Sequence, residues 1–257
     1  MIRSARLTVG TAALALLTAL GLTACSSSSS SSESGTVIVF AAASLKESFT
    51  ELGELFEKEH PGTEVTFNFN GSDSLAAGIV GGAPADVFAA ANTSTMARVT
   101  DEKLTAGDPV TFARNRLTIA TAPGNPHGID SLKDLTAPRL KVVLCDVRVP
   151  CGSAALKALS AAGADVTPDS YEQDVKSALT KVQLNEADAA VVYRTDVRAA
   201  GDKVDGVDFP EAAQAVNDYP IARLENAPNA SAADDFVALV TSAEGRKALA
   251  KAGFLAP

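Results

Sequence analysis

Short apolar runs alternate along this chain with segments whose apolar residues recur at helical spacing. The run from Val37 to Phe40 is typical of a buried strand, whereas Leu45, Phe49 and Leu52 fall close to one helix face. The pattern predicts strands at Thr36–Ala42, Glu64–Asn70, Asp86–Ala90, Leu117–Thr121, Lys141–Cys145, Ala189–Tyr193, Val204–Phe209 and Gln214–Leu224. It predicts helical segments at Leu45–Glu59, Ser72–Val80, Thr93–Lys103, Ser131–Leu135, Gly152–Ala161, Tyr171–Asn185 and Ser231–Ala252.

The order of these elements predicts an α/β protein of two lobes. Strands and helices alternate first before residue 110 and again after it, which favours parallel sheets covered by helices. The tail has no obvious lobe of its own, so we expect it to complete the first one. The expected division is 36–110 plus 211–257 for lobe 1 and 111–210 for lobe 2. Because ligands bind beyond the carboxyl ends of such strands, the cleft between the lobes is the expected site.

The N-terminus has the pattern of an export signal. Arg3 and Arg6 precede a mostly apolar stretch at 7–22, which is too short for a confident membrane span. The following Leu22-Thr23-Ala24-Cys25 resembles the lipobox of bacterial lipoproteins, and a serine tract follows it. We expect a signal peptide at 1–24, a lipidated Cys25 with a flexible tether at 25–35, and an extracytoplasmic protein anchored by lipid to the cell membrane. An ordinary secretory signal is the alternative.

The charge of the chain limits which classes of partner it can bind. The formal charge is −9, and it becomes −11 without Arg3 and Arg6, because 20 basic residues then face 31 acidic ones. Proteins bind nucleic acid through clustered basic residues, so nucleic acid is a poor candidate partner, and an anionic ligand would need local hydrogen-bond donors.

Two cysteines lie in the predicted second lobe. Cys145 and Cys151 can form a disulfide only if the chain between them doubles back, and free thiols are the alternative.

Four strand-to-helix junctions carry candidate binding chemistry. Ser44 follows three alanines, Ser72 follows Asn-Gly, Cys151 follows a proline, and residues 173–176 open a later helix. Each junction offers unpaired backbone N–H groups that an anion can use. Taken singly, each is more often a plain cap, and Ser44 with Glu47 fits a capping box.

An enzyme is the competing class of function. Cys151 at a helix start could be an activated thiolate, which would need His60 or His127 as its partner. Neither histidine has an orienting motif around it. The sequence shows no phosphate-binding Gly-Lys loop, no paired-cysteine zinc site and no metal-ligand cluster, so we expect no enzyme and no cofactor.

Four segments, in order, resemble the molybdate-binding proteins of ABC importers. They are Val39–Leu45 (VFAAASL), Gly82–Phe88 (GAPADVF), Asp174–Leu179 (DVKSAL) and Val191–Asp196 (VVYRTD). Together they cover nearly the whole chain from Thr36 to Pro257. The resemblance implies a two-lobed periplasmic-binding-protein fold of type II that closes on a tetrahedral oxyanion.

The same resemblance implies which residues hold the ligand. Ser44 and Ser72 would supply hydroxyl and amide donors, Cys151 and Val175 amide donors, and Tyr193 its phenol. Many relatives have alanine at the position of Cys151. An amide contact does not depend on the side chain, so this departure changes the expectation little.

A site made of neutral donors suits molybdate, which is a proton-free dianion. Every ligand oxygen then accepts, and a ligand hydroxyl would be left buried without a partner. We therefore expect a binder of molybdate and tungstate, a monomer with no direct metal ligand, that serves a permease and its ATPase. Sulfate or phosphate remain alternatives. Asp73 and Asp174, beside the donors, could accept from a protonated ligand, although favourable charge at helix N-termini explains both.

Overall fold

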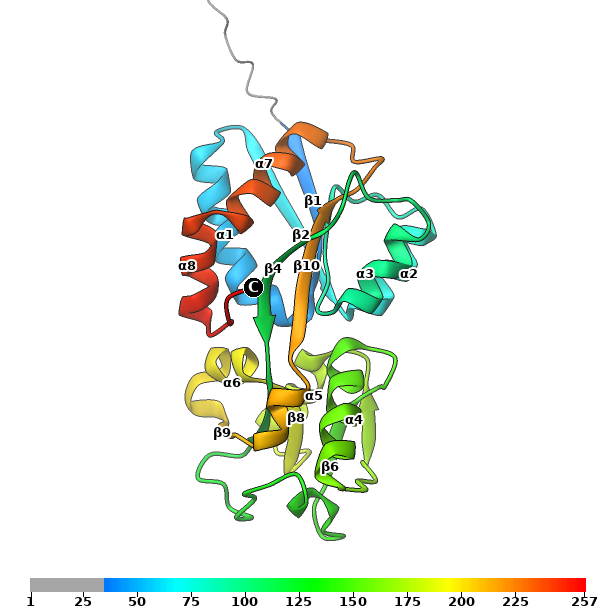
Figure 1. Ribbon diagram of the computed structural model, residues 1–257. Helices are drawn as coiled ribbons and strands as arrows, with labels where there is room; N and C mark the ends of the chain where they lie inside the picture. The colour runs from blue at the N-terminus through cyan, green and yellow to red at the C-terminus, as the bar shows by residue number, and fades with distance from the viewer. Residues whose placement is uncertain (1–34) are drawn as a thin grey trace, which may run out of the picture. The chain divides into compact units, whose positions relative to one another are not determined.

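The structure, a computed structural model, describes residues 35–257 (Figure 1). Contacts within the chain define Ser32–Pro257 as one unit. The predicted signal peptide, the lipidated Cys25 and nearly all of the predicted tether lie outside the described residues. Within the described part, no helix combines the length and the apolar character that crossing a membrane would require.

The described residues form two sheets of five strands each, with helices packed on them. The strands are β1 (Gly35–Ala42), β2 (Thr63–Asn70), β3 (Val87–Ala89), β4 (Val110–Asn115), β5 (Leu117–Thr121), β6 (Val142–Cys145), β7 (Ser170–Glu172), β8 (Ala189–Tyr193), β9 (Asp205–Val207) and β10 (Asn217–Arg223). The α-helices are α1 (Lys46–Glu59), α2 (Ser72–Val80), α3 (Thr93–Thr100), α4 (Pro150–Ala162), α5 (Val175–Gln183), α6 (Arg194–Ala200), α7 (Ala230–Thr241) and α8 (Ala243–Ala252). Short 3-10 turns lie at Ala43–Leu45, Asp134–Thr136, Gly201–Lys203 and Pro210–Gln214.

The first sheet has the strand order β2-β1-β3-β10-β4. β1 pairs in parallel with β2 and β3, and β10 pairs antiparallel with β3 and β4. Helices α1, α7 and α8 lie on one side of this sheet and α2 and α3 on the other (Figure 1). The internal strand β1 is therefore apolar on both faces, which explains its unbroken apolar run.

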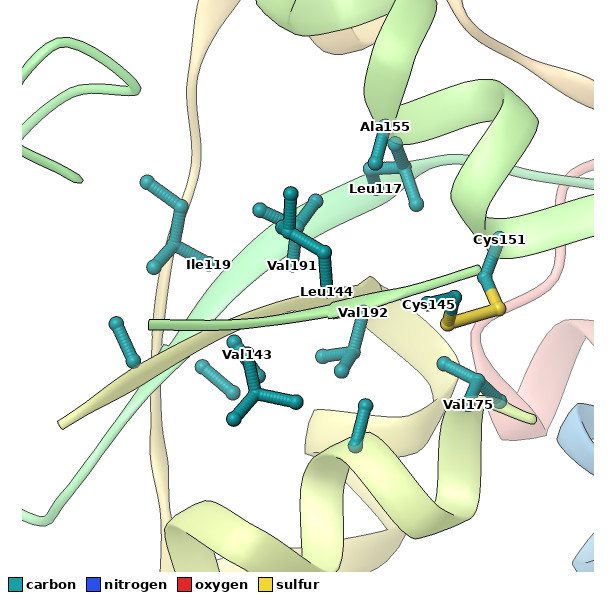
Figure 2. Close-up of a cluster of buried hydrophobic side chains, with 14 of the residues drawn as sticks. Leu117, Ile119, Val143, Leu144, Cys145, Cys151, Ala155, Val175, Val191 and Val192 are labelled. Carbon is teal, nitrogen blue, oxygen red and sulfur yellow. A yellow bond between two sulfur atoms is a disulfide. The ribbon is translucent and has the colours of Figure 1, made fainter. Parts of the chain in front are cut away.

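The second sheet has the order β7-β6-β8-β5-β9. β6 pairs in parallel with β7 and β8, whereas β5 pairs antiparallel with β8 and β9. Its buried side chains form one continuous cluster that includes Val143, Leu144, Val191 and Val192 (Figure 2). In both sheets the parallel strands lead into helices, so their carboxyl ends carry helix N-termini.

The chain passes between the sheets at two adjacent places. Arg116 alone separates β4 of the first sheet from β5 of the second. The return runs from β9 through the turn at Pro210–Gln214 to β10, and Asn217 at the start of β10 lies opposite Asn115 at the end of β4. A strand from late in the chain thus completes the first sheet. The residue bounds given above for the two lobes stay a prediction.

Most predicted elements agree with the structure within a few residues, and one does not. The helix expected from Tyr171 is wrong at its start, because residues 170–172 form edge strand β7 against β6 and the helix begins only at Val175. The Asp174 side chain accepts the N–H groups of the first turn and sets that boundary. Strand β4 and helix α6 were not predicted, since neither short segment has a clear apolar period.

Candidate functional site

One small cavity brings together all five residues that the sequence nominated as ligand contacts. Residues from both sheets line it: Ala42, Ala43, Ser44, Asn70, Gly71, Ser72, Ala91, Val149, Pro150, Cys151, Asp174, Val175 and Tyr193. They come from the carboxyl ends of strands and from the first turns of the helices that follow. This is where parallel α/β sheets place their ligands.

The size of the cavity limits what it can hold in this conformation. Its volume is about 20 Å³, and a cavity needs roughly 10–15 Å³ to hold one water molecule. Pockets for drug-sized molecules run to about 300–1,000 Å³. The cavity therefore suits one small ion rather than a sugar or an amino acid.

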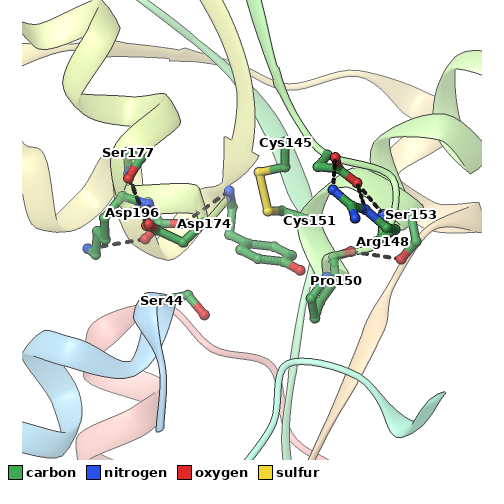
Figure 3. The surroundings of a disulfide bond; sticks show 12 residues. Ser44, Cys145, Arg148, Pro150, Cys151, Ser153, Asp174, Ser177 and Asp196 are labelled. Atoms are coloured by element: carbon green, nitrogen blue, oxygen red, sulfur yellow. Dashed lines mark hydrogen bonds and ion pairs between the residues drawn. A yellow bond between two sulfur atoms is a disulfide. The ribbon is translucent and has the colours of Figure 1, made fainter. Parts of the chain in front are cut away.

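Ser44 is buried, and its hydroxyl does not cap a helix. Its Oγ forms a hydrogen bond of 2.9 Å with the hydroxyl of Tyr219, which comes from β10. The capping box expected between Ser44 and Glu47 is wrong: Leu45 is the residue that precedes α1, and no side chain caps that helix. Figure 3 shows the Ser44 hydroxyl directed away from its own ribbon.

Ser72 is also buried, at the first position of α2. Its Oγ accepts the backbone N–H of Ala91 at 3.0 Å, so its own proton points elsewhere and is free for the cavity. The preceding Gly71 lets the chain come close to the other sheet's loops, because a Cβ there would lie 2.3 Å from the carbonyl oxygen of Gln173. Only glycine fits that approach.

Cys151 contributes a backbone amide at the start of α4. Pro150 occupies the first position of that helix, and Val149 before it cannot cap with its side chain. The first N–H groups of the helix therefore lack side-chain acceptors. Cys151 is joined to Cys145, the last residue of β6, by a disulfide with a Cα–Cα distance of 5.8 Å (Figures 2 and 3). The disulfide ties the start of α4 to the end of the strand.

Val175 offers the first amide of α5. The carboxylate of Asp174 caps this helix and accepts the next two amides, from Lys176 at 2.8 Å and Ser177 at 3.0 Å. It also accepts the hydroxyl of Ser177 (Figure 3). The cap leaves the Val175 N–H for the cavity and holds it in place.

Tyr193 ends β8 and is 1% exposed. Its phenol oxygen accepts a hydrogen bond of 2.7 Å from the side-chain amide of Asn217. Burial raises the pKa of Tyr193 well above its ordinary value, so the phenol keeps its proton. Its backbone N–H donates to Asp196 Oδ2 in the first turn of α6 at 3.2 Å, which holds the end of β8 against the start of that helix.

The lining of the cavity contains no cationic side chain. Its one carboxylate, Asp174, is occupied by the cap of α5. Asp73, the other candidate acceptor, does not line the cavity, and neither does Arg148 or Arg194. Arg148 pairs with Asp146 in its own loop at 2.8 Å. Anion binding here would thus depend on hydroxyls, amides and helix dipoles.

A charged cluster lies next to this neutral cavity. Lys176 Nζ contacts Glu47 Oε2 of α1 at 2.8 Å and Asp196 Oδ1 at 3.1 Å. Burial raises the pKa of Asp196 to about 6, although Lys176 works in the opposite direction. Burial lowers the pKa of Lys176, but the two carboxylates outweigh it and the net shift is upward. The lysine charge is therefore matched within the cluster and does not serve the cavity.

Sequence reasoning missed three residues that support the cavity from behind. Tyr219 contacts Ser44, Asn217 contacts Tyr193, and Asn115 donates to the Tyr219 hydroxyl at 3.4 Å. None of them carries a motif. Only the pairing of β4 with β10 places both asparagines behind the site.

The thiolate hypothesis does not fit the structure. The Cys151 sulfur is bonded to Cys145, so it is not a free nucleophile. His60 stacks on Phe56 with ring centroids 4.1 Å apart, and His127 pairs with Asp188 at 3.1 Å. Residues 35–257 also contain no group of three His, Cys, Asp or Glu side chains that could hold a metal ion.

Comparison with known proteins gives consistent matches over nearly the whole described chain. The model of the family described as bacterial extracellular solute-binding protein matches residues 37–255. Molybdate-binding protein ModA of Mycobacterium tuberculosis is 46% identical over 222 residues, which cover 86% of this chain and 85% of that protein. The periplasmic molybdate-binding protein of Azotobacter vinelandii is similar in structure, with a TM-score of 0.76 at 19% identity over 86% of this chain and 99% of that one. The sulfate-binding protein SubI of M. tuberculosis has a TM-score of 0.74 at 17% identity, over 86% of each chain.

Proposed function

This chain belongs to the family of bacterial extracellular solute-binding proteins, and we propose that its solute is molybdate, with tungstate as a close analogue. The family is a non-enzymatic component of transport. In the proposed role the protein captures the oxyanion outside the cytoplasm and delivers it to the permease and ATPase of an ABC importer. The identity of 46% to a protein named for molybdate binding supports this choice of solute.

The observation that carries the proposal is that hydroxyl and amide donors line the cavity, while its one carboxylate, Asp174, is occupied as a helix cap. Ser44, Ser72 and Tyr193 supply hydroxyls there, and the starts of α4 and α5 supply amides through Cys151 and Val175. A tetrahedral dianion without protons presents only acceptors, so each ligand oxygen finds a donor. Helix N-termini add partial positive charge without a countercharge that would have to be desolvated.

Sulfate meets the same donors, because it is also a proton-free tetrahedral dianion. It differs from molybdate in bond length, so the fit of the cavity has to separate the two. Hydrogen phosphate carries a proton that would need an acceptor, and the one carboxylate in the lining is already a helix cap. We therefore infer that the cavity excludes hydrogen phosphate because its proton lacks an acceptor, and sulfate because its bond lengths differ from those of molybdate.

The deciding experiment measures thermal unfolding of residues 32–257 with molybdate, tungstate, sulfate and phosphate added in turn. A ligand at a hundred times its dissociation constant stabilises the folded state by about 2.7 kcal/mol. For a chain of this length the expected rise in Tm is on the order of 5–10 °C. A rise with molybdate and tungstate alone supports the proposal, whereas a rise with sulfate or phosphate alone assigns the cavity to another oxyanion.

We also infer that Cys25 is lipidated and anchors the protein to the cell membrane. The support is the motif at residues 22–25 and the serine tract that follows it. Growth with a labelled fatty acid should label the wild-type protein and leave Cys25→Ala unlabelled. Equal labelling of both proteins would contradict the anchor. Elution of residues 32–257 in gel filtration at the mass of one chain would support the expected monomer.

A further inference from the structure

The hydroxyl groups of the cavity have hydrogen-bond donors behind them. Asn217 donates to the Tyr193 oxygen at 2.7 Å. Asn115 donates to the Tyr219 oxygen at 3.4 Å, and Tyr219 in turn contacts Ser44 at 2.9 Å. A hydroxyl has a single proton, so one that accepts from behind keeps that proton for another direction.

The orientation of both asparagine amides follows from their other contacts. Asn115 Oδ1 accepts the backbone N–H of Arg116 at 3.0 Å, so its NH₂ group faces the hydroxyls of Thr195, at 2.8 Å, and Tyr219, at 3.4 Å. Asn217 Nδ2 also donates to the carbonyl oxygen of Pro150 at 3.2 Å, and a carbonyl can only accept. Exchanging oxygen and nitrogen in either amide would set two acceptors or two donors against each other.

These contacts form two relays that end at the cavity. One runs from the Asn115 amide through the Tyr219 hydroxyl to the Ser44 hydroxyl. The other runs from the Asn217 amide to the Tyr193 hydroxyl, which also interacts with the Tyr219 hydroxyl and so joins the two relays. Burial raises the pKa of both tyrosines, so both remain protonated and able to donate.

We propose that Asn115 and Asn217, which face each other across β4 and β10, are the specificity element of this site. The asparagine pair holds the hydroxyl protons of Ser44 and Tyr193 toward the ligand. The cavity then offers donors only and excludes oxyanions that carry a proton. The inference rests on the proposed function, since it assigns the selectivity of the same cavity.

The two asparagines are positioning residues, because neither of them lines the cavity. Both asparagines also lie where the chain passes between the two sheets. Tyr193 comes from the second sheet and Tyr219 from the first, so the pair sets proton direction on both sides of the cavity at once.

The test compares two ligands of equal charge, molybdate and hydrogen phosphate, at about pH 8.5. Their dissociation constants are measured by calorimetry and by competition for residues 32–257 and for the variants Asn217→Asp, Asn217→Leu and Asn115→Asp. In Asn217→Asp the carboxylate accepts the Tyr193 proton, so phenol lone pairs face the ligand and meet the phosphate hydroxyl. The preference for molybdate over phosphate should fall on the order of tenfold or more.

Asn92→Asp is the matched control for the added charge. Asn92 follows Ala91 of the lining but does not itself line the cavity, and its Oδ1 accepts the N–H of Thr95 at 2.8 Å, a bond that aspartate keeps. Among residues 35–257 none of its side-chain hydrogen bonds involves a cavity hydroxyl. Asn92→Asp should weaken both dianions alike and leave their ratio unchanged. Asn217→Leu removes a donor without adding charge, and it should lower the ratio less than Asn217→Asp does.

The outcomes separate this inference from the proposed function. Equal ratios in wild type, Asn217→Asp, Asn217→Leu and Asn92→Asp would overturn the role of the asparagine pair while molybdate binding stands. Failure of the wild-type chain to bind molybdate would overturn the proposed function itself. If Asn115→Asp does not fold, the two Asn217 variants still decide the matter, since Asn217 is only partly buried.

Discussion

The cavity and the charged cluster beside it solve the problem of buried charge in opposite ways. The cluster of Glu47, Lys176 and Asp196 pairs one partly buried lysine with two carboxylates. The cavity keeps charged side chains out and surrounds its space with hydroxyls and amides. Val175 of the cavity and Lys176 of the cluster are neighbours in the chain, so the difference lies in side-chain direction. A site built from dipoles can bind an anion without first desolvating a charged side chain.

The charged cluster should make stability depend on pH. The pKa of Asp196 is about 6 in the folded chain against an ordinary 3.8. The folded state therefore binds the proton more tightly, and this stabilisation is present below about pH 4 and is lost as the pH rises through 6. Relative to Asp196→Asn, wild type should lose roughly 2–3 kcal/mol between pH 4 and 7. Urea unfolding of both proteins across that range measures the difference, and parallel curves would contradict it.

Loss of the Ser72 hydroxyl should weaken binding, and it should also lower stability because the buried N–H of Ala91 then lacks its acceptor. Ser72→Ala removes a donor to a charged ligand, which is worth about 1.5–3 kcal/mol, or roughly ten- to a hundredfold in Kd. Calorimetry with molybdate gives the affinity, and the Tm without ligand gives the stability. Thr50→Ala is the control, since the Thr50 hydroxyl bonds the Lys46 carbonyl on an exposed face of α1. A large loss of Tm with unchanged Kd would make Ser72 structural.

The disulfide should affect both folding and binding, because it closes a short loop and holds the Cys151 amide. Replacing Cys145 and Cys151 by alanine together is expected to cost about 2 kcal/mol of stability. The Kd for molybdate should rise several-fold, since the start of α4 is then less fixed. Chemical denaturation and calorimetry on the same preparation test both parts. Unchanged affinity would show that Pro150 and the helix suffice to aim the amide.

Helix capping should give the smallest effect and the cleanest contrast. Asp174→Ala removes the cap of α5 beside the cavity, and Asn92→Ala removes the cap of α3, which does not line it. Each should cost about 1 kcal/mol of stability. Only Asp174→Ala should also weaken molybdate binding, by a few-fold, because it frees the Val175 amide to move. Equal affinities of the two variants for molybdate would show that the cap of α5 does not contribute to binding.

Local patterns predicted most of the elements, and the resemblance to a known family nominated five residues that the structure places around one cavity. Apolar runs, capping residues and the four recognisable segments depend on neighbours within about ten residues, and a sequence displays those directly. The helix α2 was predicted with its observed bounds, and Ser44, Ser72, Cys151, Val175 and Tyr193 line one cavity.

Only the tertiary structure decided what the polar side chains do. Ser44 was expected to cap a helix with Glu47, but its partner is Tyr219, and Glu47 instead pairs with Lys176. The pairing of Cys145 with Cys151 depended on how the chain folds between them. The two asparagines lie together because β4 and β10, which are far apart in the chain, pair in a register that sets Asn217 opposite Asn115. Apolar burial follows local periodicity, whereas a hydroxyl takes whichever partner the register of distant strands brings to it.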